Sequence, residues 1–229
     1  EGYPVSAVWE YMLTVLNSNY EQWRIANPDT DIKDFPLSLS HMSNSGALFD
    51  LVKLNDISRE LISKLSAEAV NTELIEWSQE YDRDFAAVLS EDKDYTLKAL
   101  SIGRGIEKPR KDISSYKQAK DYLSFYYDKL FEIKDPWPVQ VSEEDRKEII
   151  KRYLSTYSQS DDKTVWFDKI KEITAALGYA VQIKKYKNNP ELYKGSIADV
   201  SNVIRIAVVG LANSPDLWEV SQVLGMERV

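Results

Sequence analysis

The sequence predicts an all-α fold. Apolar residues recur at spacings of three and four in many segments, strict alternation is rare, and the 229 residues include 8 Gly. A composition of 43% apolar and 11% aromatic residues is typical of a folded globular protein and excludes disordered and collagen-like chains. The absence of cysteine excludes thiolate catalysis, cysteine-ligated zinc and disulfides. No segment approaches the ~18 apolar residues of a membrane span, so we expect a soluble, cytoplasmic protein.

The first helix is expected directly after Pro4, with Asn17 ending it. Its apolar stripe consists of Val5, Val8, Tyr11, Met12, Val15 and Leu16. Residues 27–47 contain Pro28 and Pro36 and predict loops and short irregular pieces. A second helical region is expected to open near Asp56. Ser66 is suited to cap a further helix that runs to about Glu80, because its hydroxyl can accept from an amide of the first turn.

A long amphipathic helix is predicted after Asp112, running to Phe131. Residues 135–138 (DPWP) cannot continue it, since proline lacks an amide donor and restricts the residue before it. We therefore place the main boundary of the chain at this segment.

Three further helices are expected in the C-terminal part. Ser142 begins one that runs to about Tyr157, and Asp162 or Thr164 begins another through Leu177 with Gly178 as its stop. Ser196, with an acid three residues on, begins the third.

A short last helix is predicted with Ser214 as N-cap, Pro215 at the first helical position and Gly225 as its stop. The β-branched run at residues 203–209 would be a buried strand by propensity alone.

Charge is distributed unevenly along the chain. Residues 1–92 carry a net charge of −11, residues 93–134 carry +4, and the whole chain carries −8. An acidic protein is unsuited to non-specific nucleic-acid binding, which depends on many lysines and arginines, so DNA is not an expected partner. A local basic face in residues 93–134 remains open, and so does the alternative of a solvated lysine-rich helix.

No catalytic constellation is found in the sequence. His41 is the single histidine, so no Ser-His-Asp arrangement forms without it, and a surface position in a loop is expected for it. Gly103-Arg104-Gly105 lacks the third glycine of a dinucleotide site, and no phosphate-binding loop motif occurs. We therefore expect no catalytic, metal-binding or cofactor-binding residues in this chain and a role in binding instead.

Two segments are candidates for binding. In residues 107–112 (EKPRKD), a proline-fixed turn presents Lys108, Arg110 and Lys111 just before a predicted helix N-terminus, whose amides would attract phosphate. Arg110 could read a base edge, or could pair with Asp112 or with a neighbouring helix. The second segment, residues 213–218 (NSPDLW), could cradle an unstacked base, with its tryptophan expected in the core.

Several separated segments resemble the bacterial glutamyl-tRNA synthetases, in the order of that family. Residues 203–210 (VIRIAVVG), 214–220 (SPDLWEV) and 223–229 (VLGMERV) resemble its C-terminal signature. Residues 2–8 (GYPVSAV) and 47–55 (ALFDLVKLN) look like stretches that follow the catalytic KMSKS loop. Residues 41–43 (HMS) are not that loop, because no lysine flanks Met42-Ser43.

The resemblance implies the tRNA-binding portion of glutamate–tRNA ligase, a class 6 ligase that attaches glutamate to its tRNA using ATP and Mg. The catalytic domain with HIGH and KMSKS motifs would precede Glu1, so this portion alone is expected to be inactive and to need no cofactor. Residues 1–60 would be the remainder of the stem-contact region. Residues 61–134 and 135–229 would be two helical anticodon-binding subdomains, in which the β-branched run is helical. A monomer is expected.

By the same resemblance, Arg110 would read the third anticodon base and help to reject glutamine tRNA, and Arg205 would contact the first. Ser214, Pro215 and Leu217 would pack around the anticodon nucleotides, and Lys108 and Lys111 could touch the tRNA backbone. Two alternatives remain: a stand-alone helical RNA-binding or protein-interaction module without synthetase activity, and a helical regulator or scaffold.

Overall fold

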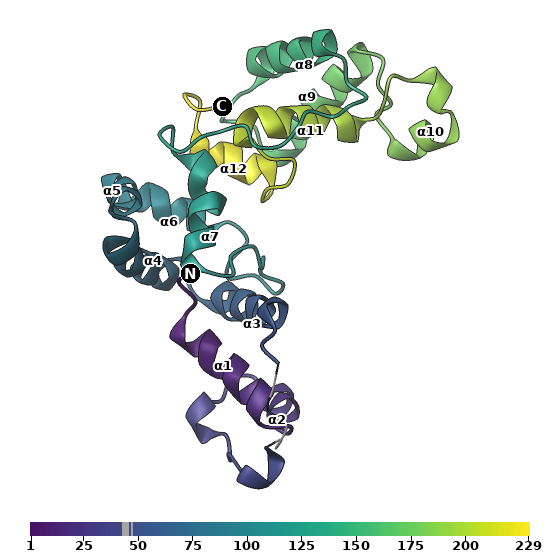
Figure 1. Ribbon diagram of the computed structural model, residues 1–229. Helices are drawn as coiled ribbons and strands as arrows, with labels where there is room; N and C mark the ends of the chain where they lie inside the picture. The colour runs from purple at the N-terminus through teal and green to yellow at the C-terminus, as the bar shows by residue number, and fades with distance from the viewer. Residues whose placement is uncertain (43–45, 47) are drawn as a thin grey trace. The chain divides into compact units, whose positions relative to one another are not determined.

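The computed structural model describes residues 1–42, 46 and 48–229, and the ribbon in Figure 1 consists of helices joined by loops. In these residues there are twelve α-helices and no β-strand, so the all-α prediction is confirmed. Ala47 of the match at residues 47–55 and Ser43 of the HMS segment lie outside the described residues. Within the described part of the chain, no helix is long and apolar enough to cross a membrane.

The chain forms two compact units, Glu1–Tyr122 and Leu123–Val229. The division therefore falls earlier than residues 135–138, where the sequence placed the main boundary. The assignment of residues 1–60, 61–134 and 135–229 to three functional parts remains a prediction.

The first unit is built from short helices joined by loops. Helix α1 packs against α3, and α4 packs against α5 and α6. Its helices are α1 (Val5–Leu16), α2 (Tyr20–Ala26), α3 (Leu51–Lys64), α4 (Ala67–Tyr81), α5 (Arg83–Glu91), α6 (Lys93–Ser101) and α7 (Tyr116–Leu123). The last residue of α7 is the first residue of the second unit. Residues 27–42 contain the short 3-10 turns η1 (Ile32–Asp34) and η2 (Leu39–His41).

Helix α1 has the predicted bounds, between Pro4 and Asn17. Its apolar stripe is mostly exposed, however. Val5 is 72% exposed, and Val8, Met12 and Leu16 are about 40% exposed. The buried face of α1 carries Ala7, Glu10 and Tyr11.

Two helix starts in the first unit depend on side-chain caps. The Ser66 hydroxyl accepts a hydrogen bond from the amide of Ala69 at 3.2 Å, which confirms the predicted start of α4. Helix α3 begins at Leu51, five residues before the predicted opening near Asp56, because the Asp50 carboxylate accepts from the amide of Lys53 at 3.1 Å.

The long helix predicted after Asp112 is wrong. Helix α7 covers Tyr116–Leu123 only, and a 3-10 turn, η3 (Ser124–Tyr126), follows it. Asp112 does not cap α7, because the helix begins four residues later, at Tyr116; both carboxylate oxygens of Asp112 accept from Arg110. The Ser115 hydroxyl accepts from the amide of Gln118 at 3.4 Å instead, and the remaining apolar residues of the segment continue in loops.

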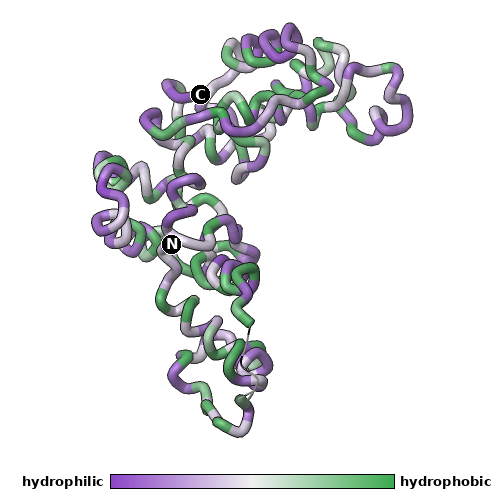
Figure 2. Tube along the Cα trace, viewed as in Figure 1, coloured by the Kyte–Doolittle hydropathy of each residue, from purple (hydrophilic) through white to green (hydrophobic). Residues whose placement is uncertain are grey.

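The second unit has five α-helices beyond η3, and α11 packs against α8 and α9. They are α8 (Glu143–Thr156), α9 (Lys163–Ala176), α10 (Ile183–Asn188), α11 (Ile197–Val209) and α12 (Leu217–Leu224), with the 3-10 turn η4 (Pro190–Leu192) after α10. Most of the predicted caps are confirmed: Ser142 caps α8, Asp162 caps α9, and Ser196 forms a capping box with Asp199 at α11. The hydrophilic and hydrophobic stretches of these helices alternate along the trace in Figure 2.

The β-branched run at residues 203–209 is helical, as the resemblance implied. It lies in α11, where Val203, Ile204, Ile206 and Val209 are each at most 1% exposed. Burial on several sides of one helix outweighs β-propensity here, because the packing of the whole element decides. The predicted cap of α12 is wrong by two residues: Asp216 accepts from the amide of Glu219 at 3.2 Å, and Ser214 lies outside the helix.

Candidate nucleic-acid interface

Arg110 lies in the loop between α6 and α7, in a close approach to Gly103. The backbone N–H of Arg110 donates to the carbonyl of Gly103 at 3.0 Å. Gly103 has φ +71°, and a Cβ atom placed on it would come within 2.8 Å of Cγ and Cδ of Arg110. The aliphatic stem of Arg110 is therefore held over the backbone of Gly103, a position that a larger residue there would disturb.

Asp112 fixes the guanidinium of Arg110. Nε and Nη2 donate to the two carboxylate oxygens of Asp112 at 2.6 and 2.9 Å, a bidentate pair at a partly exposed position. The pairing of Arg110 with Asp112, one of the two roles expected for this arginine, is thus observed. The same pairing fixes the plane in which the guanidinium of Arg110 is presented.

The two neighbouring lysines differ in their surroundings. Lys111 forms an ion pair with Glu60 of α3, and its ammonium holds the pKa of that carboxyl below its usual value. Lys108 is exposed. A phosphate could approach Lys108 directly, whereas at Lys111 it would compete with Glu60.

The helix N-terminus expected to attract phosphate beside these residues is occupied. The amide of Tyr116 donates to the carbonyl of Gly2 at 2.8 Å, and the amide of Lys117 donates to that of Glu1 at 3.4 Å. The first residues of the chain therefore satisfy amides of α7 that a phosphate would need. Lys108, Arg110 and Lys111 lie in a loop and are not assisted by a helix end.

In the second unit, three of the predicted residues meet. Nη1 of Arg205, on α11, donates to the hydroxyl of Ser214 and to the carbonyl of Pro215, the latter at 3.2 Å. The Ser214 hydroxyl in turn donates to the Pro215 carbonyl at 2.8 Å. The loop before α12 thus determines where the guanidinium of Arg205 lies.

The same loop is anchored from its other side by residues that follow η3. The carbonyl of Gly210 accepts from the amides of Lys134 and Asp135 at 2.9 and 3.1 Å, and the Asp135 carboxylate accepts from the amide of Ala212 at 2.7 Å. Gly210 passes so close to Glu132 that a Cβ atom would lie 2.2 Å from its carbonyl oxygen. Backbone contacts therefore fix the course of residues 210–213.

Leu217 and Trp218 are not presented to solvent as a base platform. Leu217 is 4% exposed in the core of the second unit. Trp218 is half-buried, and its indole Nε1 donates to the carbonyl of Asp161 at 3.1 Å. The exposed part of this loop consists of Ala212 and Asn213.

No protein-family model matches the sequence. Glutamate–tRNA ligases are similar to it along its whole length. The ligase of Acetivibrio thermocellus is 52% identical over 228 residues, and that of Sorangium cellulosum is 42% identical over 230 residues. The ligase of Clostridium perfringens (strain 13) is 39% identical over 233 residues. Each match covers 100% of this chain. The chain is homologous to part of the glutamate–tRNA ligases.

The chain spans about two fifths of these glutamate–tRNA ligases, namely 42%, 40% and 43% of their lengths. The resemblance carried by the separated motifs is thereby confirmed. Among solved structures, a glutamate-tRNA synthetase from Elizabethkingia anophelis is 16% identical, with a TM-score of 0.48 over 83% of this chain and 32% of that one.

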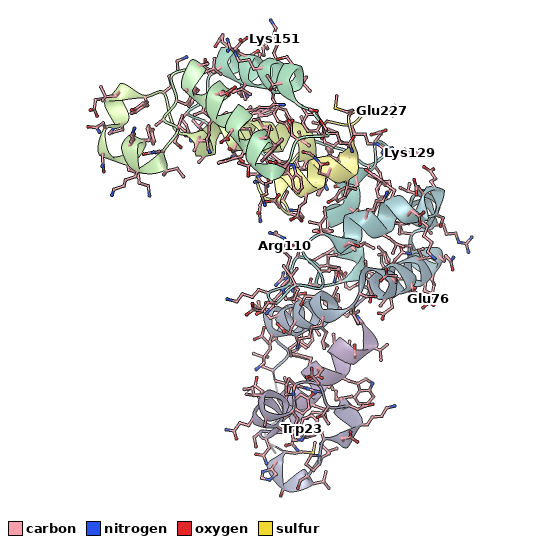
Figure 3. The ribbon with its side chains drawn as sticks, turned by 180° about the vertical axis from the view of Figure 1, so that it is seen from behind. Trp23, Glu76, Arg110, Lys129, Lys151 and Glu227 are labelled. Atoms are coloured by element: carbon pink, nitrogen blue, oxygen red, sulfur yellow. The ribbon has the colours of Figure 1, made fainter. Side chains whose placement is uncertain are left out.

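Arg104, for which the sequence predicted no role, has a structural role beside Arg110. Its Nη1 donates to the carbonyl of Ile62 at 2.5 Å and to that of Leu65 at 3.4 Å, so it caps the C-terminal end of α3. Burial lowers the pKa of Arg104. Arg104 is thus tied to the protein backbone, whereas Arg110, which is labelled in Figure 3, pairs with the side chain of Asp112.

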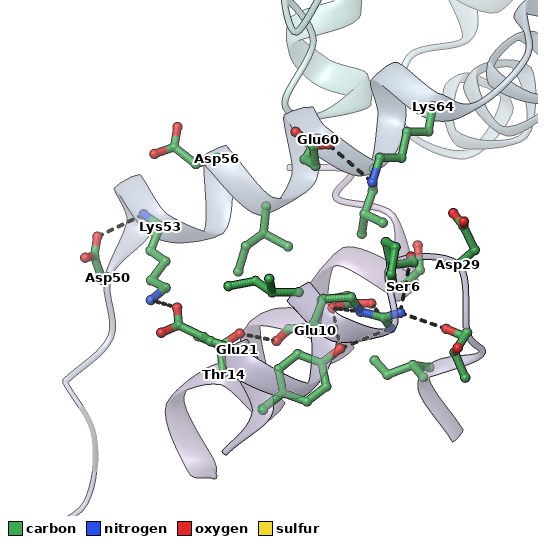
Figure 4. A pocket seen from close by; sticks show the side chains of 18 of the residues that line it. Ser6, Glu10, Thr14, Glu21, Asp29, Asp50, Lys53, Asp56, Glu60 and Lys64 are labelled. Carbon is green, nitrogen blue, oxygen red and sulfur yellow. Dashed lines mark hydrogen bonds and ion pairs between the residues drawn. The ribbon is translucent and has the colours of Figure 1, made fainter. Parts of the chain in front are cut away.

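A cavity of about 860 Å³ between α1, α2 and α3 was also missed (Figure 4). Among the residues that line it is a network in which Tyr20 donates to the carboxylate of Glu10 and Nε of Arg24 donates to the same carboxylate at 3.2 Å. Nη1 of Arg24 also donates to the carbonyl of Thr30 at 2.7 Å. The network ties α1 to α2 and the following loop, and Glu10, the acid at its centre, is 9% exposed.

His41 is exposed in η2, as expected of a surface histidine. Among the residues whose placement is described, no group of three or more histidine, aspartate or glutamate side chains could hold a metal ion.

Proposed function

We propose that this chain is the anticodon-recognising, tRNA-binding portion of a glutamate–tRNA ligase. The observation that carries the proposal is similarity over 100% of the chain to glutamate–tRNA ligases, with 52% identity to one of them. The complete ligase would attach glutamate to its tRNA with ATP and Mg, in the cytoplasm and as a monomer. This part would supply recognition of the tRNA and no cofactor site.

In this proposal Arg110 reads the third anticodon base and Arg205 the first. An arginine fork can donate two hydrogen bonds to a base edge and discriminates between bases by about 1–3 kcal/mol. Specific RNA recognition targets unstacked loop bases, so a few such contacts suffice in a protein with a net charge of −8. Lys108 and Lys111 would contact the tRNA backbone beside Arg110.

In each loop, neighbouring residues would orient the arginine, and the arginine would contact the base. Asp112 holds the plane of the Arg110 guanidinium, and Ser214 and Pro215 hold that of Arg205. Because Leu217 is 4% exposed, it would support the loop before α12 from the core of the second unit. Preorganised donors lose less conformational entropy on binding, which favours discrimination by these two side chains.

Binding of the chain to the anticodon stem-loop of glutamate tRNA tests this function. Fluorescence anisotropy at low salt would compare that stem-loop with one in which all three anticodon bases are changed. We expect the unaltered chain to prefer the cognate loop, and Arg110→Ala and Arg205→Ala each to reduce that preference about tenfold. Arg83→Ala, at an exposed position on α5, removes the same charge elsewhere and should leave the preference unchanged.

Equal binding of both loops, or none, would overturn anticodon reading by this chain. It would favour the stand-alone helical module instead. In the complete ligase the same two substitutions should slow aminoacylation about tenfold while affecting glutamyl-adenylate formation less. Equal losses in both steps would contradict the assignment.

A further inference from the structure

Residues 181–195, here called the lysine excursion, form a segment of the second unit whose two ends are joined by backbone hydrogen bonds. The amide of Ala180 donates to the carbonyl of Gly195 at 2.9 Å, and the amide of Ile197 donates to that of Ala180 at 2.8 Å. The amide of Lys194 donates to the carbonyl of Gly178 at 3.2 Å. The excursion contains α10 and η4, which contact each other.

Asp145 of α8 clamps the two ends of this segment. One of its carboxylate oxygens accepts from the hydroxyl of Tyr179 at 2.9 Å, and both accept from the ammonium of Lys194 at 2.9 and 3.0 Å. Tyr179 is 2% exposed, so the clamp is partly buried. The excursion is therefore held at its stem, and Lys194 is neutralised there.

The tip of the excursion concentrates positive charge. Lys184, Lys185 and Lys187 are all exposed on α10, and Glu191 is the one acidic residue between 181 and 195. No ion pair involving these three lysines is found in the described part of the chain. This stretch is hydrophilic along α10 in Figure 2. Such a cluster in a protein of net charge −8 is not explained by solubility, for which acidic residues serve at least as well.

We propose that the lysine excursion binds the phosphate backbone of the RNA, without reading its bases. The excursion contains no arginine, and the ammonium of lysine acts as a point charge that suits a phosphate oxygen and lacks the fork that reads a base edge. Lysine is also depleted in protein–protein interfaces, which favours a phosphate partner over a protein. The inference rests on the proposed function, and it assigns a second contact to the same tRNA.

The salt dependence of binding measures this contact directly. Each phosphate neutralised by a lysine makes the plot of log K against log salt steeper by about 0.7 to 0.9. With a labelled transcript of glutamate tRNA, the triple variant Lys184→Gln, Lys185→Gln, Lys187→Gln should lose about 2 from the slope of the unaltered chain. Replacing the same three residues by arginine should preserve the slope.

A matched control removes the same charge from elsewhere in the second unit. The triple variant Lys147→Gln, Lys151→Gln, Lys171→Gln alters exposed or half-buried positions on α8 and α9 and should leave the slope nearly unchanged. Circular dichroism would verify that each variant keeps its helices. Equal loss in the two glutamine triples would mean that net charge alone matters, and would overturn the assignment.

The remaining outcomes separate this inference from the proposed function. If the unaltered chain prefers the cognate anticodon but the excursion variant keeps its full slope, the proposed function stands and the lysine excursion is not a phosphate contact. If the excursion variant also loses preference between the cognate and altered stem-loops, the excursion reads bases, which contradicts the inference. If the unaltered chain binds no RNA, the proposed function fails first and the phosphate role with it.

Discussion

Arg205 on α11 donates to the hydroxyl of Ser214, a residue that lies just outside the N-terminus of α12. The same nitrogen donates to the carbonyl of Pro215, so one guanidinium joins a helix to the loop that precedes the next. Ser214 is 9% exposed, and its hydroxyl is therefore a buried partner of a charged donor. Such hydrogen bonds are stronger than those between neutral groups.

Substituting Ser214→Ala should loosen Arg205 without removing its charge. We expect a loss of about 1 kcal/mol in unfolding free energy, since a buried hydrogen bond to a charged group is lost. Binding to the cognate anticodon stem-loop should weaken about fivefold, the equivalent of that energy. Urea denaturation and anisotropy give the two values. Full binding by the Ala variant would show that Arg205 does not depend on this partner, and Ser214→Thr, which keeps a hydroxyl, should bind as the unaltered chain does.

The turn at Gly210 should tolerate no side chain. Gly210→Ala places a Cβ atom 2.2 Å from the backbone oxygen of Glu132, so the backbone itself must move. We expect a loss of more than about 2 kcal/mol in unfolding free energy, measured by thermal or urea denaturation. Gly178→Ala is the matched control: it has a similar positive φ but open space around the added atom, and should cost about 1 kcal/mol. Equal costs would contradict the close contact.

Stability at alkaline pH should depend on Tyr20. Burial, with a further contribution from the hydrogen bond to Glu10, raises the pKa of Tyr20 from 10.0 to about 12. Because the pKa of Tyr20 is higher in the folded state, its contribution to stability is fully present below pH 10. That contribution is lost between pH 10 and about 12, where Tyr20 ionises in the unfolded chain but is still protonated in the folded one. Tyr20→Phe should lower the unfolding free energy by about 1–3 kcal/mol at neutral pH and flatten its fall above pH 10. An unchanged alkaline profile would show that Tyr20 titrates normally.

Local rules predicted much of the fold. Ser66, Ser142 and Asp162 cap the helices that their position before an amphipathic run predicts, because a cap needs only a side chain and the first turn. Asp112 failed as a cap because α7 begins four residues later, at Tyr116, and the Asp112 carboxylate accepts from Arg110. A helix-capping rule identifies a suitable side chain but does not show that the segment after it stays in a loop.

Contacts between residues far apart in the sequence could not be predicted from local patterns either. The β-propensity of residues 203–209 predicts a strand, whereas the segment is helical, because burial on several sides decides its state. Only the resemblance placed these residues in a helix. For the candidate site, the resemblance supplied Arg110 and Arg205, and the chain order alone could not show that Arg205 meets Ser214. The Glu10–Arg24 network was not foreseen, because charged residues 14 positions apart give no periodic signal.

The position of Arg110 over Gly103 yields the sharpest test of its role. Gly103→Ala places a Cβ atom 2.8 Å from Cγ and Cδ of Arg110, so the arginine side chain must shift while its charge and its chemistry stay in place. If Arg110 reads an anticodon base, we expect preference for the cognate stem-loop to fall about tenfold, because a bidentate contact depends on orientation. Anisotropy with the cognate and altered stem-loops measures that preference.

Gly105→Ala is the control within the same loop. Gly105 has φ +67°, close to that of Gly103, but nothing lies within 4 Å of the added atom. Both substitutions therefore impose the same kind of backbone strain of about 1–2 kcal/mol, and only one displaces Arg110. Loss of preference in Gly103→Ala alone ties recognition to the orientation of the Arg110 side chain. Equal losses in the two variants would attribute the effect to the strained loop, and no loss in either would leave Arg110 as a partner of Asp112 with no part in recognition.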